Sequence, residues 1–92
     1  MSVTVRIPTV LRKLTAGQDE VVAAAGTVGQ VLESVGQEHA GFLARVRPDP
    51  DAVQPFLNLF VNGEDVRFAQ GLQTPVRDGD EVSIIPSIAG GR

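Results

Sequence analysis

Alternating apolar and polar residues open the chain. Residues 2–7 follow a period of two, which is typical of a strand with one buried face, and Pro8 ends the pattern. The apolar positions of this strand are Val3, Val5 and Ile7. A connection over residues 9–17 with one helical turn leads to a second strand at 19–24. The sequence therefore predicts two strands that pair antiparallel.

The clearest helical pattern begins at residue 28. Apolar residues spaced three and four apart form one stripe, made of Val28, Val31, Leu32 and Val35. Thr27 and Gln30 form a capping-box pattern at its start. Gly29 and Gly36 each weaken a helix by up to about 1 kcal/mol relative to Ala, so we expect packing to stabilise it.

The second half of the chain alternates short strands and turns. In chain order we expect a helical turn at 40–46, a proline-rich loop at 47–55, a strand at 57–61, a tight turn at Asn62-Gly63, a short return strand at 66–68, a loop at 71–76, a turn at 78–80, a last strand at 81–85 closed by Pro86, and a tail.

This order of elements predicts an α+β fold, a ubiquitin-like β-grasp with a mixed sheet of about five strands and one main helix packed on one face. The first and last strands are expected to be adjacent and parallel. The sheet face under the helix is formed by Val3, Val5, Ile7, Leu57, Leu59, Val61, Val82 and Ile84. Residues 1–86 form this domain, and residues 87–92 form a flexible C-terminal tail that carries Gly-Gly.

Composition narrows the functions open to such a domain. A chain of 92 residues fits one small domain, and 42% hydrophobic with 21% charged residues argues against disorder. The net charge of −3 disfavours a nucleic-acid partner, and the absence of cysteine excludes thiolate chemistry on side chains. No apolar run approaches a membrane span or a signal peptide. We therefore expect a soluble cytoplasmic protein without a membrane partner.

The tail is the main candidate for chemistry. Residues 87–91 follow the last strand and reach about 16 Å when extended. Gly90 and Gly91 lack a Cβ, so they can enter a narrow active site and let a backbone carbonyl approach closely. A frayed terminus is the alternative interpretation, since glycine-rich ends are common.

Several motifs spread over the chain support the first interpretation. Residues 61–68 read Val-Asn-Gly-Glu-Asp-Val-Arg-Phe, and Ala89-Gly90-Gly91 follows the last strand. The other matching segments are Val3-Thr-Val, Ile7-Pro-Thr, Leu11-Arg12, Gly71-Leu72, Asp78-Gly-Asp80, Val82, Ile84 and Pro86. With these motifs the chain resembles the MoaD/ThiS family of ubiquitin-like sulfur carriers, and above all its cysteine-biosynthesis branch.

The resemblance implies a carrier and not an enzyme. An E1-like adenylating and sulfurtransferase partner, which uses ATP, activates the carboxylate of the terminal glycine in this family, and a thiocarboxylate follows. Gly91 is then the thiocarboxylate and adenylation site, and Ala89 and Gly90 enter the partner's active site with it. Later partners are a PLP-dependent cysteine synthase and a JAMM-type (Mov34-like) zinc metallopeptidase. The carrier itself needs no cofactor.

One residue departs from the family pattern. Carriers of this kind end at the second glycine, whereas Arg92 follows Gly91 here. We expect Arg92 to be a processed residue that a peptidase removes. The alternative is that the carboxylate of Gly91 is not the one used.

A docking surface for partners is predicted beside the tail. If Leu59 and Ile84 face the helix, alternation directs Phe60 and Ile85 to the other face, where they form an apolar surface with Ile88. The resemblance implies that the activating enzyme binds this kind of sheet face. The alternative is a second layer in which the proline-rich loop covers it.

The remaining polar candidates are interpreted as structural. Asp78-Gly79-Asp80 has too few carboxylates for a calcium loop and is typical of a turn, so no metal site is predicted. His39 fits a helix end, and Glu64-Asp65 fits a solvated rim. Three other functions stay open: a carrier for molybdopterin or a siderophore, a ubiquitin-like modifier conjugated to lysines through Gly91, and an adaptor that only binds.

Overall fold

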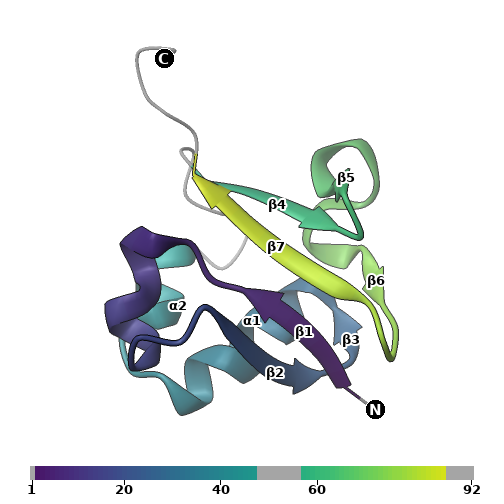
Figure 1. Ribbon diagram of the computed structural model, residues 1–92. Helices are drawn as coiled ribbons and strands as arrows, with labels where there is room; N and C mark the ends of the chain where they lie inside the picture. The colour runs from purple at the N-terminus through teal and green to yellow at the C-terminus, as the bar shows by residue number, and fades with distance from the viewer. Residues whose placement is uncertain (1, 48–56, 87–92) are drawn as a thin grey trace, which may run out of the picture.

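The computed structural model describes residues 2–47 and 57–86. Its main feature is a five-stranded mixed sheet in the order β2-β1-β7-β4-β5, with the helices on one face only (Figure 1). The elements are β1 (Ser2–Arg6), η1 (Thr9–Thr15, a 3-10 helix), β2 (Glu20–Ala24), β3 (Gly26–Thr27), α1 (Val28–Glu38), α2 (Phe42–Val46), β4 (Leu57–Val61), β5 (Glu64–Asp65), the 3-10 helices η2 (Val66–Phe68) and η3 (Gly71–Gln73), β6 (Pro75–Val76) and β7 (Glu81–Pro86).

The first and last strands form the centre of the sheet. β1 pairs parallel with β7, with Thr4 beside Glu81 and Arg6 beside Ser83. β2 pairs antiparallel with β1, and β4 pairs antiparallel with β7 over its whole length. The expected β-grasp arrangement, with adjacent parallel first and last strands, is confirmed.

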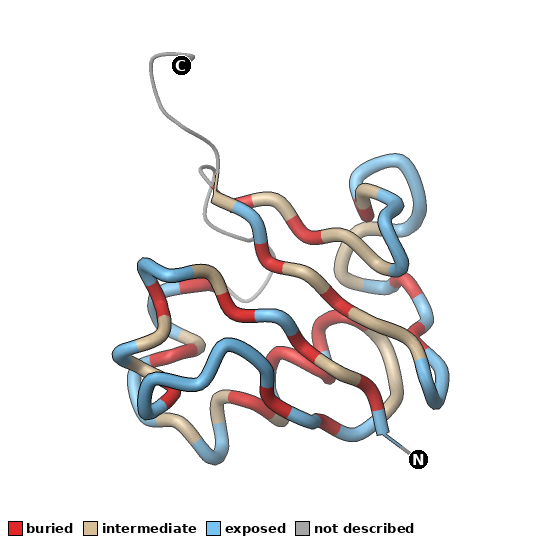
Figure 2. The backbone as a smooth tube through the Cα atoms, in the orientation of Figure 1, coloured by how far each residue is buried: buried red, intermediate tan, exposed pale blue. Residues whose placement is uncertain are grey.

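The core lies between the sheet and α1. Buried and exposed residues alternate along the central strands, so that one sheet face is buried and the other is open (Figure 2). Of the eight residues predicted to face the helix, seven are at most 5% exposed, and Val61 is half-buried against the core. Phe42 of α2 is fully buried in this core.

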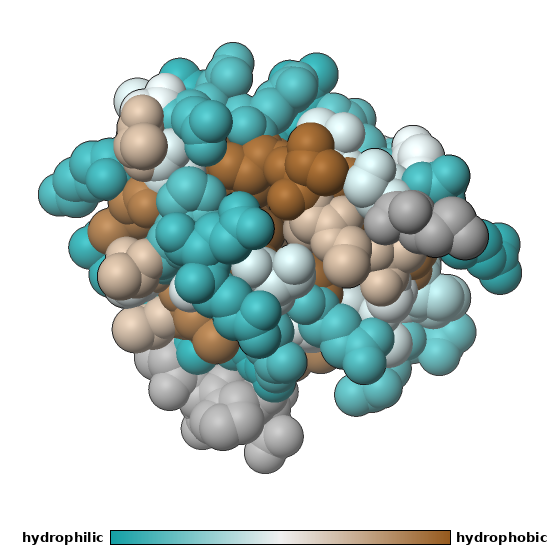
Figure 3. Space-filling model, turned by 90° about the horizontal axis from the view of Figure 1, so that it is seen from below, coloured by the Kyte–Doolittle hydropathy of each residue, from teal (hydrophilic) through white to brown (hydrophobic). Residues whose placement is uncertain are grey.

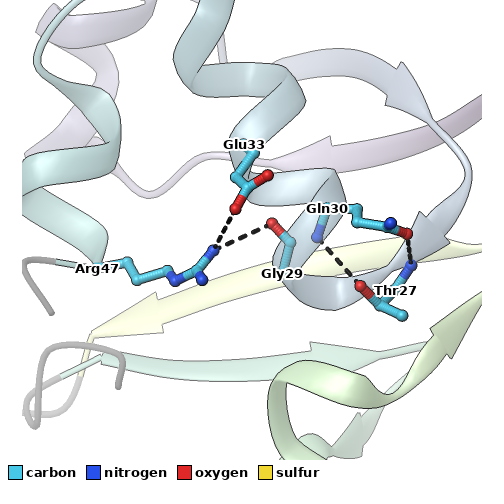
Figure 4. A network of polar contacts seen from close by, with 5 residues as sticks. All are labelled: Thr27, Gly29, Gln30, Glu33 and Arg47. Carbon is cyan, nitrogen blue, oxygen red and sulfur yellow. Dashed lines mark hydrogen bonds and ion pairs between the residues drawn. The ribbon is translucent and has the colours of Figure 1, made fainter. Parts of the chain in front are cut away.

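The start of α1 is fixed by a capping box and by one arginine (Figure 4). The Gln30 amide N–H donates to Thr27 Oγ1 at 3.2 Å, and the Thr27 amide N–H donates to Gln30 Oε1 at 2.9 Å. Arg47, at the end of α2, donates to the Gly29 carbonyl at 3.3 Å and to the Glu33 carboxylate at 3.2 Å. The Arg47 contacts connect α2 to α1, and together with the capping box they offset the weak helix propensity of Gly29.

The predicted return strand at 66–68 is wrong. The two-residue turn at Asn62 and Gly63, both at positive φ, lets the chain resume pairing immediately, so the return strand is β5 at Glu64–Asp65. The Asp65 carboxylate accepts from the Arg67 amide at 2.9 Å and caps η2, which ends the strand there.

A second, two-stranded sheet was not predicted. β6 lies within the expected loop at 71–76 and pairs antiparallel with β3, next to the first turn of α1. Thr74 is 8% exposed, and its carbonyl accepts from the Val28 amide at 2.9 Å. This small sheet places η3 against the start of α1.

Candidate functional site

The site begins where β7 ends. β7 runs through the middle of the sheet, and its last described residue, Pro86, lies opposite Leu57 of β4. Pairing with β1 stops at Ser83, three residues earlier. Ile88, Ala89, Gly90, Gly91 and Arg92 lie outside the described residues, so their predicted roles stay predictions.

The open sheet face carries a continuous row of residues next to this strand end. Strand register puts the row in the order Glu20, Arg6, Ser83, Phe60 and Asp65, one residue from each strand. Ile85 lies beside Asn58 in the next row. As predicted, the structure places Phe60 and Ile85 on the face opposite α1, because their neighbours Leu59 and Ile84 are buried in the core.

The two apolar residues of this face differ in exposure. Ile85 is 46% exposed, whereas Phe60 is half-buried between Ser83 and Asp65 of the neighbouring strands. Ser83 is small and adds little bulk next to the ring. The face therefore presents one accessible aliphatic residue and one partly accessible aromatic residue beside the start of the tail.

A hollow of about 210 Å³ opens on this face where β1 and β7 separate. Its lining includes Pro8, Arg12, Asp19, Ser83 and Ile85. Arg12 Nε donates to the Ile7 carbonyl at 3.1 Å, which orients the guanidinium. Its two terminal nitrogens form no hydrogen bond with the described residues and remain available to an acceptor.

Ion pairs frame the open face on both sides. Arg6 pairs with Glu20 at 3.2 Å and with Glu81. At the far edge, Arg67 pairs with Asp65, with Nη2 to Oδ2 at 2.8 Å, and its hydrogen bonds hold the pKa of the Asp65 carboxyl below its ordinary range. Charged pairs thus flank the apolar residues of this face on two sides.

The turn at 78–80 lies at the other end of β7 and binds the protein's own groups. The Ser2 amide donates to Asp78 Oδ1 at 2.7 Å, while Asp80 accepts from the Arg77 amide at 2.8 Å and from Asn62 Nδ2 at 3.0 Å. The hydrogen bonds to Asp80 lower the pKa of its carboxyl, and the bond from the Arg77 amide contributes most. Among the described residues no three His, Cys, Asp or Glu side chains gather at a metal site.

The two most exposed large hydrophobic residues were not among the predicted site residues. Phe68 is 81% exposed in η2, and Val22 is 68% exposed on β2. The alternation of β2 could have identified Val22, since Val21 and Ala23 face the core. Phe68 could not be identified, because the residues around it were assigned to a strand. No helix in the described part of the chain has the length and apolar character to cross a membrane.

The fold and the open face beside a C-terminal tail define a protein of the ubiquitin-like β-grasp class. Residues 5–91 match the ThiS family, and the chain belongs to that family. It is 44% identical to the sulfur carrier protein CysO of Mycobacterium tuberculosis, over 99% of this chain and 100% of CysO.

Two further relatives bear on function. The crystal structure of the BexX/CysO complex of Amycolatopsis orientalis matches with a TM-score of 0.90 and 45% identity, over 97% of this chain and 99% of that chain. The small archaeal modifier protein 3 of Haloferax volcanii is 42% identical over 65 residues, which is 71% of this chain and 70% of the modifier.

Proposed function

We propose that this protein is a sulfur carrier that holds a thiocarboxylate at Gly91 and donates its sulfur to the biosynthesis of cysteine or a related product. The observation that carries the proposal is the 44% identity to a named sulfur carrier along the whole chain, in a sequence that keeps Ala89-Gly90-Gly91 after the last strand. The protein acts as a carrier in this proposal, and partner enzymes perform the chemistry.

The chemistry starts with release of the Gly91 carboxylate. The Gly91 carbonyl is bound in the peptide bond to Arg92, so a water molecule must first cleave that bond, and a JAMM-type zinc peptidase is the proposed catalyst. A carboxylate oxygen of Gly91 then attacks the α-phosphorus of ATP on the E1-like partner, and pyrophosphate leaves. Sulfide sulfur attacks the acyl carbon of the resulting adenylate, and AMP leaves. The product is a thiocarboxylate.

The absence of cysteine fits this role. The chain contains no thiol, so any sulfur it carries must be bound at its backbone terminus. A thiocarboxylate is ionised and nucleophilic at neutral pH, as a thiolate is. It can therefore donate sulfur to an acceptor on a PLP-dependent cysteine synthase without a side chain from the carrier.

The open sheet face is the proposed docking surface for these partners. Ile85 lies in β7, the strand from which the tail leaves, and Phe60 lies in the neighbouring strand β4. Ile88 follows three residues after Ile85. The hollow beside them adds a charged contact, because the free terminal nitrogens of Arg12 suit a carboxylate of the activating enzyme. The relative from Amycolatopsis orientalis forms a complex with BexX, which supports a protein partner for this class.

One experiment separates this proposal from its rivals. The chain ending at Gly91 is incubated with an E1-like partner, ATP and sulfide, and its intact mass is measured. Replacement of one oxygen by sulfur supports the carrier, and an unchanged mass supports an adaptor that only binds. A carrier for molybdopterin or a siderophore would also be thiolated, so transfer to the cysteine synthase identifies the pathway.

A ubiquitin-like modifier is the second candidate function. The likeness to the small archaeal modifier protein over 71% of the chain is the observation that favours it. A modifier joins its Gly91 carbonyl to a lysine amine, and AMP leaves from the adenylate. Lysine-linked conjugates on a denaturing gel of cell extract, lost when Gly91 is deleted, would support this function.

A further inference from the structure

The outer edge of β2 exposes backbone hydrogen-bonding groups. β2 ends the sheet on its side, and no described strand pairs with its outer edge (Figure 1). The Ile7 amide donates to the Asp19 carbonyl at 2.8 Å, which makes these two residues a hydrogen-bonded pair of the antiparallel β1–β2 ladder. Hydrogen-bonded and non-hydrogen-bonded pairs alternate in such a ladder. Thr4 and Val22, three steps along, are therefore a non-hydrogen-bonded pair.

The direction of the β1 amides supports this assignment. The Thr4 amide donates to the Asp80 carbonyl at 3.1 Å, which lies on the other side of β1 from β2. It follows that Val22, together with Glu20 and Ala24, directs its own amide and carbonyl away from β1, toward the free edge. Every second residue of β2, three in all, thus offers one amide donor and one carbonyl acceptor at the free edge.

The same three residues have their side chains on the open sheet face. Val22 is 68% exposed, and Glu20 and Ala24 are also exposed. Seen from below, an apolar patch over β2 is surrounded by polar side chains (Figure 3). β2 has no lysine, proline or bulge of the kind that protects an edge strand from pairing.

We propose that the β2 edge is a self-association surface, on which a second copy of this chain pairs antiparallel about a two-fold axis at Val22. In that register Val22 faces Val22 of the second copy, and Glu20 faces Ala24. Each of the three pairs exchanges two backbone hydrogen bonds, and every outward group of β2 is used. A shift by two residues would use only two pairs. A shift by four would leave a single pair, either Glu20 opposite Glu20 of the second copy or Ala24 opposite Ala24.

Charge agrees with this register. The Glu20 carboxylate is paired within its own chain to Arg6 Nη1 at 3.2 Å, and the residue opposite it in the second copy is an alanine. No like charges therefore face each other directly across the two-fold axis. The two open faces join into one continuous sheet of ten strands, five from each copy.

The pairing leaves the candidate functional site free. The axis is perpendicular to the sheet, so the β7 strands of the two copies run in opposite directions and their ends lie at opposite ends of the joined sheet. β1 separates β2 from β7 in each copy. A single added strand buries less than the roughly 800 Å² per partner of a stable complex, so we expect reversible association with Kd in roughly the high micromolar to millimolar range.

Backbone amide exchange on the full chain tests the proposal. At low concentration the amides of Glu20, Val22 and Ala24 should exchange rapidly, while those of Val21 and Ala23, bonded to β1, are protected. Raising the concentration to about 1 mM should slow the first three by about twofold to fivefold and increase the sedimentation coefficient in parallel. Association without protection of these three amides would overturn the proposal, as would a monomer at every concentration.

A matched pair of variants tests the register. Val22→Lys places two like charges opposite each other at the axis and should abolish the concentration dependence. Val10→Lys changes another exposed valine, 54% exposed in η1 and outside the strand, and should leave the association unchanged. Equal loss in both variants, or in neither, contradicts pairing at β2. If Val22→Lys folds poorly, the exchange measurement on the unmodified chain decides the question alone.

Discussion

The side chain of Asn62 connects two turns that lie far apart in the sequence. Its amide nitrogen donates to Asp80 Oδ1 at 3.0 Å, and its carbonyl oxygen accepts from the Glu81 amide at 2.9 Å. Asn62 also has a φ of +51°, which asparagine adopts more readily than most residues. One residue therefore both forms the β4–β5 turn and fixes the start of β7, whose other end leads to the tail.

Asn62→Ala should destabilise the fold by about 1–3 kcal/mol, because it removes both hydrogen bonds and places a Cβ-bearing residue without side-chain bonding in the left-handed region. Asn62→Gly removes the same bonds but tolerates positive φ, so it should cost less. The free energy of unfolding in urea measures both. An alanine variant as stable as the parent would show that the connection between the turns contributes nothing.

Stability should fall in acid through two aspartates. The Arg67 side chain lowers the Asp65 pKa, and the Arg77 amide with Asn62 lowers the Asp80 pKa. An aspartate whose pKa is lower in the folded state stabilises the protein at pH values above its unfolded pKa of about 3.9. This contribution is lost as the pH falls through the folded pKa.

Unfolding by urea at a series of pH values checks this dependence. Asp65→Asn and Asp80→Asn should each flatten the acid limb of the stability curve. Glu64→Gln is the matched control, since the side chain of the exposed Glu64 accepts no hydrogen bond from the described residues and only its backbone pairs with β4. An acid limb of equal slope in all three variants and the parent would contradict the role of these aspartates.

The two glycines of α1 should respond differently to alanine. A Cβ on Gly29 would lie 3.4 Å from the Leu72 carbonyl, an ordinary contact, so Gly29→Ala should stabilise the helix by roughly 0.5–1 kcal/mol. A Cβ on Gly36 would lie 3.0 Å from Leu43 Cβ of α2. Gly36→Ala should therefore gain nothing or lose stability, and Leu43→Ala should not relieve this contact, because alanine keeps the Cβ. Equal gains at both positions in thermal unfolding would contradict this packing argument.

Two phenylalanines provide a matched test of the docking surface. Phe60→Ser should weaken activation by the E1-like partner about tenfold or more, since aromatic residues at the centre of an interface contribute most to binding. Phe68→Ser changes a more exposed phenylalanine outside the proposed surface and should leave activation unchanged.

The comparison is made on the KM for the carrier, with the free energy of unfolding measured alongside. A loss at Phe68 with none at Phe60 would place the docking surface elsewhere. If Phe60→Ser unfolds the protein, then Phe60 is a core residue, and Ile85→Ser tests the same surface with an exposed side chain.

Regular patterns made most of the fold predictable. The alternation of Val3 and Val5 and the spacing of Val28 and Val31 correspond to β1 and α1, because these elements bury one face and repeat over several residues. The two-residue strands β3 and β6 could not be predicted, since no period is visible in so short a segment. The return strand was misplaced because the capping of η2 by Asp65 depends on a side-chain geometry that composition does not indicate.

The sequence predicted which sheet face the site residues occupy, but not how exposed each side chain is. Alternation placed Phe60 and Ile85 on the open face, yet their different exposure depends on the cross-strand neighbours Ser83 and Asn58, which only the register reveals. The hollow at Arg12 depends on the separation of β1 from β7 and has no sequence signal.

The central claim is that the Gly91 carboxylate is the group that becomes activated. Its most direct test compares two chains, one of residues 1–92 and one of residues 1–91, each incubated with the E1-like partner, ATP and sulfide. The guanidinium of Arg92 is bulky and always charged, and Gly91 in the longer chain is held in an amide that cannot attack ATP. Intact mass should therefore show a thiocarboxylate only on the chain ending at Gly91, and on the longer chain only after a zinc peptidase has removed Arg92. Thiolation of the longer chain with Arg92 still attached would contradict the claim.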